Sequence, residues 1–111
     1  MTKLLKYMTW EEAEKELETT KIAIIPTGST EQHGPHMPLG TDFIIAEYIA
    51  NEVANKTNVI VTPVIPVGFA AYHRDFKGTL SVDIDILAKY YEGIAESLLL
   101  YGITHILFIN G

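Results

Sequence analysis

Three short, mainly apolar runs in the chain predict β-strands. They cover residues 21–25, 59–61 and 104–109, and the second run resumes at residues 64–65 after a proline. The first run ends at Pro26, which has no N–H to donate to a neighbouring strand, so we expect the strand to stop there. These runs lack the alternation of apolar and polar residues that marks a half-exposed strand. We therefore expect strands buried on both faces, as in a parallel sheet.

A first short helix is predicted near the start of the chain. The side chain of Thr9 can accept a hydrogen bond from the backbone N–H of Glu12, whose carboxylate can reach back to the N–H of Thr9. This reciprocal arrangement is a capping box. We expect the helix to start at Trp10 and to fade near Glu18.

Two longer helices are predicted between the strands. The first begins at Asp42 with Thr41 as its N-cap and runs to about Lys56. The second has Ser81 as its expected N-cap and ends at Gly102, a residue suited to the left-handed conformation that terminates helices. The expected apolar face of the first helix is Ile45, Ile49 and Val53. That of the second is Ile84, Leu87, Ala88, Tyr91, Ile94, Ala95, Leu98 and Leu99.

The alternation of strands and helices predicts the α/β class. The order β-α-β-α-β gives a parallel sheet with right-handed crossovers. Ligands of such sheets bind outside the carboxyl ends of the strands, where the loops at residues 26–41 and 66–80 and the segment from Asn110 emerge. Because Gly111 follows a buried type of strand directly, we expect the chain to be part of a longer domain.

The composition is that of a folded globular protein, with 48% hydrophobic and 20% charged residues. No apolar run approaches the ~20 residues of a membrane-spanning helix. The first ten residues also lack the apolar stretch of a signal peptide. We therefore expect a cytoplasmic protein that does not bind membranes.

Charge and cysteine content narrow the chemistry. The chain has 14 acidic and 8 basic residues and a net charge of -6, so its electric field repels phosphate backbones and nucleic acid is not an expected partner. It has no cysteine. Any metal ion must therefore be held by His, Asp or Glu.

The loop after the first strand carries residues suited to metal binding. Glu31 and His33 are two residues apart, so in an extended backbone their side chains point the same way. Asp42 opens the next helix, where the helix dipole favours a carboxylate. Together they offer oxygen and imidazole ligands for Zn, Mn or Fe, and His36 is a fourth candidate. The same spacing also fits a capping Asp42, a solvated Glu31 and histidines packed against prolines.

A second polar cluster lies in the loop at residues 66–80. His73 is a candidate general acid or base, or a hydrogen-bond donor to a substrate. Arg74 and Asp75 equally fit an ordinary surface ion pair. Four other polar or aromatic residues are expected to be structural: His105, Tyr90, Tyr91 and Tyr101.

The segment at residues 27–30 follows a strand in the way a phosphate-binding loop does. The GxxxxGK[ST] spacing is missing, however, and neither GxGxxG nor GxSxG occurs. A nucleotide-binding α/β module is therefore a weaker alternative.

Residues 26–42, with the sequence PTGSTEQHGPHMPLGTD, closely resemble the signature of the creatininase (creatinine amidohydrolase) family. The resemblance continues over residues 68–81 and in the final Ile-Asn-Gly at residues 109–111. It implies a three-layer creatininase-like α/β fold. It also implies that residues 1–111 are the amino-terminal part of a single domain, truncated before the second metal-ligand motif.

The resemblance also assigns the metal ligands. Glu31 matches a ligand of one metal ion, His33 a ligand of the other, and Asp42 the carboxylate that bridges the two. The family's remaining His and Glu ligands follow an Asn-Gly and would lie beyond Gly111. Each ion would therefore lack one protein ligand in these 111 residues.

The segment around His73 resembles the part of the family that flanks the substrate pocket, and residues 76–79 share the match. Two positions depart from the family pattern. Ala70 stands where Ser is common, and Lys77 stands where Pro is common. These departures bear on substrate recognition.

The activity that the resemblance implies is metal-assisted hydrolysis of a small non-peptide amide, often a cyclic amide or a formamide. Two divalent ions per subunit, with zinc favoured over manganese or iron, would activate water and polarise the substrate carbonyl. A hexameric homo-oligomer is implied as well. Two alternatives stay open: an inactive fragment of such an enzyme and a nucleotide-binding module. We expect residues 1–111 alone to have little activity and weak metal affinity.

Overall fold

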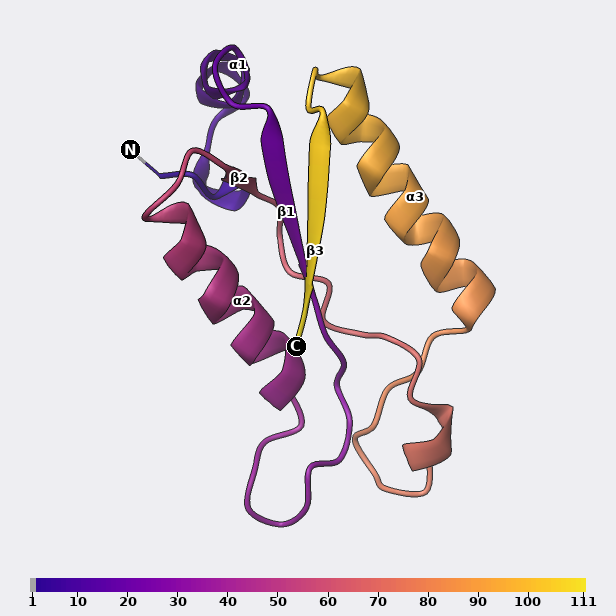
Figure 1. The fold of residues 1–111 in the computed structure, drawn as a ribbon. Coiled ribbons are helices and arrows are strands. Elements are labelled where there is room, and N and C mark those ends of the chain that lie inside the picture. Colours follow the sequence, from indigo (N-terminus) through magenta and orange to yellow (C-terminus); the bar gives the residue numbers. More distant parts are fainter. Residues whose placement is uncertain (1) are drawn as a thin grey trace.

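A three-stranded parallel sheet forms the centre of the computed structural model, which describes residues 2–111. The strands are β1 (Ile22–Thr27), β2 (Ile60–Val61) and β3 (His105–Asn110). Their order is β2-β1-β3, so β1 lies in the middle with β3 along its full length (Figure 1). The three apolar runs thus form the predicted parallel sheet, and the α/β class is confirmed.

The prediction that β1 ends at Pro26 was wrong, because the strand continues to Thr27. Pro26 pairs with Ile109 of β3 in the sheet register. On its other side the neighbouring segment interrupts its pairing after Val61 and resumes it at Ile65. The missing N–H of the proline therefore faces a gap in the ladder, where no hydrogen bond is lost.

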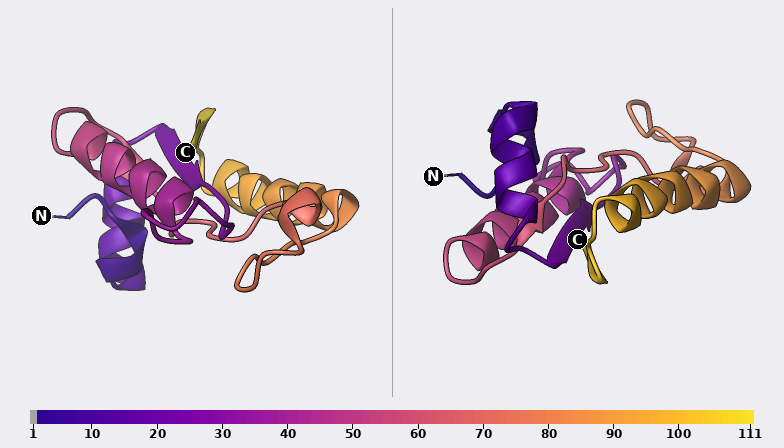
Figure 2. Two further views of the ribbon diagram at one scale, coloured as in Figure 1. Left: turned by 90° about the horizontal axis from the view of Figure 1, so that it is seen from below. Right: turned by 90° about the horizontal axis from the view of Figure 1, so that it is seen from above.

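Helices cover both faces of the sheet. Helix α2 (Thr41–Ala54) packs on one face and α3 (Ile84–Leu100) on the other, as the views along the strands show (Figure 2). Successive residues of β1 alternate between two hydrophobic clusters. On the α3 side the cluster contains Ala23, Ile25, Ile65, Leu98 and Ile103. On the α2 side it contains Ile24, Ala50, Ala54, Val59 and Val61.

The face of α2 that packs on the sheet is only partly the predicted one, because Val53 packs against the core cluster but Ile45 and Ile49 do not. Its buried residues are Ala46, Ala50 and Ala54, whereas Ile45 and Ile49 are exposed. Helix α2 is apolar on both sides, so periodicity alone did not decide which side turns inward. Alanine side chains let the helix axis approach the strands closely, and this contact selects the small-residue face.

The N-caps of the two long helices also differ from the prediction. Thr41 is the first residue of α2, and its hydroxyl donates to the carbonyl of Pro38 at 2.6 Å instead of capping the helix. Asp83 precedes α3, and Ser81 accepts a hydrogen bond from the backbone N–H of Ala70 at 3.0 Å. Both hydroxyls therefore stabilise the adjoining loops.

The predicted helix terminator is confirmed. Gly102 has φ = 93° and ends α3. The N–H of Ile103 donates to the carbonyl of Leu98 at 3.1 Å, and the N–H of Gly102 donates to that of Leu99 at 3.1 Å. This is a Schellman motif, and the contact between Ile103 and Leu98 belongs to the core.

The amino-terminal segment and the second loop contain the shorter helices. Helix α1 (Trp10–Leu17) begins with the predicted cap, in which Thr9 accepts from the N–H of Glu12 at 3.2 Å. The 3-10 helices η1 (Leu5–Tyr7) and η2 (Ala71–His73) complete the set. No helix in the described part of the chain combines the length and the apolar character needed to cross a bilayer.

Apolar side chains remain exposed over two large areas. Strand β3 lies at the edge of the sheet, where Leu107 is exposed and Phe108 is half-exposed. The outer side of α2 also exposes apolar residues: Ile44, Ile45, Tyr48 and Ile49. The radius of gyration is 15.1 Å, above the ~13 Å typical of a compact domain of about 100 residues. These surfaces are suited to further protein contacts.

We expect Gly28→Ala to destabilise the fold by about 1–3 kcal/mol, the usual cost of overpacking. A Cβ at Gly28 would lie 2.5 Å from both the backbone N and the Cα of Phe43, so the start of α2 would have to move. Urea unfolding measures the loss. Gly93→Ala is the matched control, because a Cβ at Gly93 in the middle of α3 meets nothing within 4 Å and alanine favours the helix. A Gly28→Ala protein as stable as the control would contradict the expected packing.

Candidate functional site

The polar loops meet at the carboxyl edge of the sheet. Strands β1 and β3 end side by side at Thr27 and Asn110, whose side chains lie 3.3 Å apart. The loop at residues 28–40 leaves β1 there, and the start of α2 returns to the same edge (Figure 1). The backbone N–H of Gly111 donates to the carbonyl of Thr27 at 2.9 Å, which extends the hydrogen bonding between the two strands to their ends.

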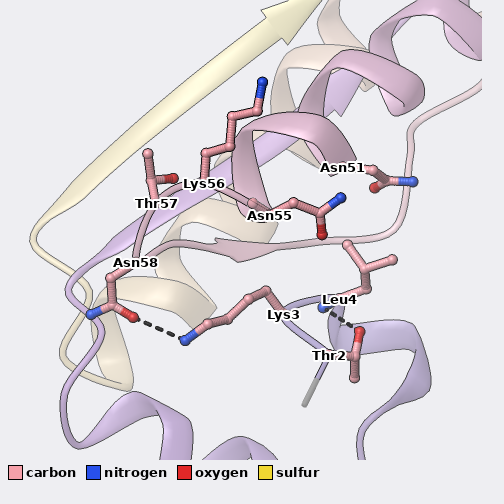
Figure 3. A pocket seen from close by; sticks show the side chains of 9 residues that line it. Thr2, Lys3, Leu4, Asn51, Asn55, Lys56, Thr57 and Asn58 are labelled. Atoms are coloured by element: carbon pink, nitrogen blue, oxygen red, sulfur yellow. Dashed lines mark hydrogen bonds between the residues drawn. The ribbon is translucent and has the colours of Figure 1, made fainter.

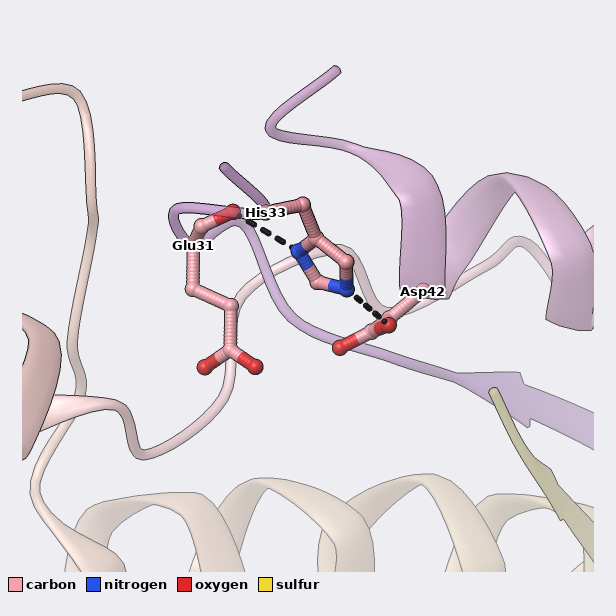
Figure 4. A group of neighbouring side chains, drawn as sticks. All are labelled: Glu31, His33 and Asp42. Carbon is pink, nitrogen blue, oxygen red and sulfur yellow. Dashed lines mark hydrogen bonds and ion pairs between the residues drawn. The ribbon is translucent and has the colours of Figure 1, made fainter. Parts of the chain in front are cut away.

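Glu31, His33 and Asp42 come together at this edge, as their spacing predicted. One potential ligand atom from each lies within 4.8 Å of the others (Figure 4). His33 Nε2 is 3.0 Å from Asp42 Oδ1, and the Glu31 carboxylate lies beside this pair. All three side chains are partly buried.

The loop backbone orients the imidazole of His33. The N–H of Glu31 donates to the carbonyl of Leu39 at 3.0 Å, which fixes the loop on both sides of His33. His33 Nδ1 lies 3.1 Å from the carbonyl of Glu31, and a carbonyl only accepts, so Nδ1 carries a proton. Nε2 is thereby left to face Asp42. An imidazole held in this way through Nδ1 presents Nε2 as a metal ligand.

These contacts shift the titration of His33. The carbonyl of Glu31 contributes most to raising the pKa of His33 above 6.5, partial burial lowers it, and the negative charge of Asp42 raises it further. Both ring nitrogens face acceptors, so the imidazolium form is favoured when no metal ion replaces the proton on Nε2.

Asp42 is held by a residue that the sequence analysis had not selected. Asp42 lies in the first turn of α2, and its Oδ2 accepts a hydrogen bond of 2.6 Å from the hydroxyl of Ser29. Its two carboxylate oxygens thus have different partners, Ser29 and His33. The position of Ser29 beside β1 had suggested only a phosphate-binding loop.

The donor set suits a divalent transition metal ion. Two carboxylates and one imidazole converge, and no lysine or arginine forms an ion pair with them among residues 2–111. Such mixed oxygen and nitrogen sets bind Zn, Mn or Fe. His36, the fourth candidate, is exposed and is not a member of the group.

His73 approaches the first loop through Gln32. Gln32 Nε2 is 3.1 Å from His73 Nδ1, so the second candidate cluster contacts the residue that lies between Glu31 and His33. His73 itself is not part of the group of potential ligands. Arg74 and Asp75 are both exposed. The sequence analysis missed Gln32, although its place between two candidate ligands was a usable signal.

A cavity of about 460 Å³ opens beside Glu31 and Asp42. Its walls combine the polar ends of the strands with apolar and aromatic side chains. The apolar part consists of Phe69, Tyr72, Leu87, Tyr91 and Phe108. Tyr91 and Phe108 stack with ring centroids 5.4 Å apart, so Tyr91 has the packing role expected for it. Tyr90, Tyr101 and His105 are exposed, and His105 Nδ1 lies 2.9 Å from the hydroxyl of Thr104.

A larger cavity of about 640 Å³ lies at the opposite end of α2 (Figure 3). Amides, hydroxyls and two lysines line it, and its most central cation, Lys3, already contacts Glu16 at 3.0 Å and Asn58 at 2.9 Å. Among the described residues, the group of potential metal ligands lies elsewhere. The smaller cavity is therefore the better candidate site.

The chain is similar to proteins of one known family. The profile of the creatinine amidohydrolase (creatininase) family matches residues 6–111. A solved structure named "Creatininase Mn" superposes with a TM-score of 0.93 at 25% identity, covering all of this chain and 46% of that one.

Two curated relatives carry other names. The mycofactocin precursor peptide peptidase of Mycobacterium tuberculosis is 32% identical over 103 residues, which cover 84% of this chain and 41% of that protein. The 3-dehydro-scyllo-inosose hydrolase of Thermotoga maritima is 31% identical over 105 residues, covering 94% and 34%. The chain thus spans less than half the length of these relatives.

In the metal-free protein, we expect Asp42→Asn to lower the pKa of His33, because the negative charge that favours the imidazolium is removed. The raised pKa means that proton binding to His33 stabilises the folded state fully below pH 6.5, and that this contribution is lost as the pH rises through the raised value. Metal binding at Nε2 must displace this proton and should weaken as the pH falls. NMR titration of the imidazole measures the shift.

The matched control for this titration is Asp75→Asn, which removes an exposed carboxylate from the other loop. It should leave the His33 curve unchanged. A wild-type His33 that titrates below 6.5 would contradict the hydrogen bonding described above.

Proposed function

The chain belongs to the creatininase family, and we propose that it is the amino-terminal part of a single-domain, metal-dependent hydrolase that cleaves an amide C–N bond. The observation that carries this proposal is the convergence of Glu31, His33 and Asp42 beside a cavity at the carboxyl edge of the sheet. Open parallel sheets bind their ligands at this edge.

Two divalent ions per subunit are proposed, with Glu31 holding one, His33 the other and Asp42 contacting both. Oδ1 of Asp42 faces His33 and Oδ2 faces Ser29. The two oxygens therefore point in different directions, which supports the role of Asp42 as a bridge. Zinc is the first choice, and manganese, after which one similar creatininase is named, or iron also fits the ligands. When bound, such ions act as Lewis acids toward a carbonyl oxygen and bring the pKa of water toward neutrality.

The protein's own residues would orient the substrate and the ligands. Ser29 holds the Asp42 carboxylate through its 2.6 Å hydrogen bond, and the carbonyl of Glu31 holds the His33 ring. Tyr91 and Phe108 form an aromatic wall on one side of the cavity. We assign His73 to the substrate side, where it would orient the amide by a hydrogen bond or transfer a proton.

A small planar amide, such as a cyclic amide or a formamide, fits the flat aromatic rings that line the cavity. A peptide amide is the second candidate, because the peptidase relative is 32% identical. Nucleotide binding is disfavoured by the carboxylate of Asp42 at the start of α2 and by the hydroxyl of Ser29, which is already bonded to Asp42.

We also propose that the protein forms a homo-oligomer. The exposed apolar side of α2 and the exposed edge strand β3 provide surfaces that a second subunit or another part of the same domain would cover.

Asp42→Ala in the whole protein should lose at least one metal ion per subunit and nearly all turnover, since the proposed bridge serves both ions. Elemental analysis gives the metal content, and cyclic ureides, formamides and small amides assayed with added Zn or Mn give the turnover. Asp75→Ala, which removes an exposed carboxylate, is the control. Unchanged metal content in Asp42→Ala would exclude the proposed ligand role.

His73→Ala should keep its metal and lose turnover by ~10²-fold or more if His73 transfers a proton. The reason is that His73 contacts Gln32 and lies outside the group of potential ligands. Metal analysis and steady-state kinetics on the same sample separate the two effects. Loss of metal from this variant would instead make His73 a ligand.

A further inference from the structure

Gln32 makes three hydrogen bonds, two of which connect the two loops of the site. Its backbone N–H donates to the hydroxyl of Thr79 at 3.1 Å. Its side-chain Oε1 accepts from the backbone N–H of Gly34 at 3.1 Å. Its Nε2 lies 3.1 Å from His73 Nδ1. The side chain is thus held between its own loop and the second loop.

The partners of Gln32 determine which atom of its amide faces His73. The N–H of Gly34 can only donate, so the amide oxygen must face Gly34 and the NH₂ group must face His73. An NH₂ group also only donates, so Nδ1 of His73 must accept. A neutral imidazole that accepts at Nδ1 carries its proton on Nε2.

The ring of His73 is held in place for this contact. It is half-buried, with the Tyr72 ring at a centroid distance of 4.9 Å and the Phe76 ring at 6.5 Å. The N–H of Phe76 donates to the carbonyl of His73 at 3.0 Å. The two loops are also joined by the bond from the N–H of Leu80 to the carbonyl of Thr30 at 2.9 Å.

We propose that Gln32 is a positioning residue that holds His73 as the neutral tautomer with its proton on Nε2. This inference rests on the proposed function and refines it. Tyr72, whose ring lies 4.9 Å from that of His73, lines the cavity. With Nδ1 occupied by Gln32, the N–H at Nε2 is the donor that His73 would offer to a substrate carbonyl oxygen. His73 is not a free base in this state, so its role is to orient and polarise the amide rather than to remove a proton from water.

Gln32→Glu is the most direct test, because the carboxylate has the same shape but only accepts. It can still bind the N–H of Gly34, and it requires a proton on His73 Nδ1. In the ¹⁵N NMR spectrum of the neutral imidazole, Nε2 should be protonated in the wild type and Nδ1 in Gln32→Glu. The signal of His73 is assigned as the one missing from His73→Asn.

Kinetics provide the second readout, on whole protein brought to equal metal content. Gln32→Glu should reduce kcat by about tenfold, the effect of one hydrogen bond, because Nε2 no longer donates. His73→Asn places an amide oxygen at the position of Nδ1 and keeps the bond to Gln32, but it has no group at Nε2. It should lose turnover at least as strongly. A merely structural role predicts that His73→Asn retains activity.

The outcomes separate this inference from the proposed function. Wild-type His73 with its proton on Nδ1 overturns the inference, even if the protein binds metal and hydrolyses amides. So does a Gln32→Glu spectrum identical to that of the wild type. The tautomer switch in a protein without metal or turnover supports the role of Gln32 in setting the tautomer and overturns the proposed function. The switch together with full activity in Gln32→Glu overturns the donor role of His73.

Discussion

Close backbone packing between the start of α2 and the ends of β1 and β3 is the constraint on which the site depends. Gly28 lies against the backbone of Phe43, and a Cβ at Gly111 would overlap the carbonyl of Asp42. Helix α2 therefore begins directly over the strand ends, with Asp42 in its first turn. If the helix stood back by the width of one methyl group, Asp42 would lose its contacts with both Ser29 and His33.

The site brings the carboxylates of Glu31 and Asp42 close together, and neighbouring groups offset their negative charge. The positive end of the α2 dipole faces Asp42, and Nε2 of His33 lies 3.0 Å from its Oδ1. In the proposed site, a proton on His33 and a bound metal ion would be alternative ways to balance the negative charges of Glu31 and Asp42. The hydrogen bond from Ser29 holds Oδ2 of Asp42.

The hydrogen-bonded loops and the exposed apolar side chains lie on different parts of the molecule. The two loops are joined by backbone and side-chain bonds through Thr30, Gln32 and Thr79, whereas the outer side of α2 and the edge of β3 have few partners. The loops at the strand ends are therefore organised by this chain alone. The surfaces of α2 and β3 are suited to contacts with other protein segments, which fits a chain that spans less than half of its relatives.

Features that depend on neighbouring residues follow directly from the sequence. The apolar runs specified the strands, Thr9 specified a helix start, and Gly102 specified a helix end. The proximity of Glu31 and His33 followed from their spacing of two residues. Features whose energy depends on distant partners follow only from the tertiary contacts. The buried face of α2 runs through Ala46, Ala50 and Ala54 because small side chains allow close contact with the sheet. Pro26 stays within β1 because its neighbour leaves a gap, and Ser29 and Gln32 acquire their roles from the carboxylate and imidazole that the fold brings to them, contacts that no local pattern encodes.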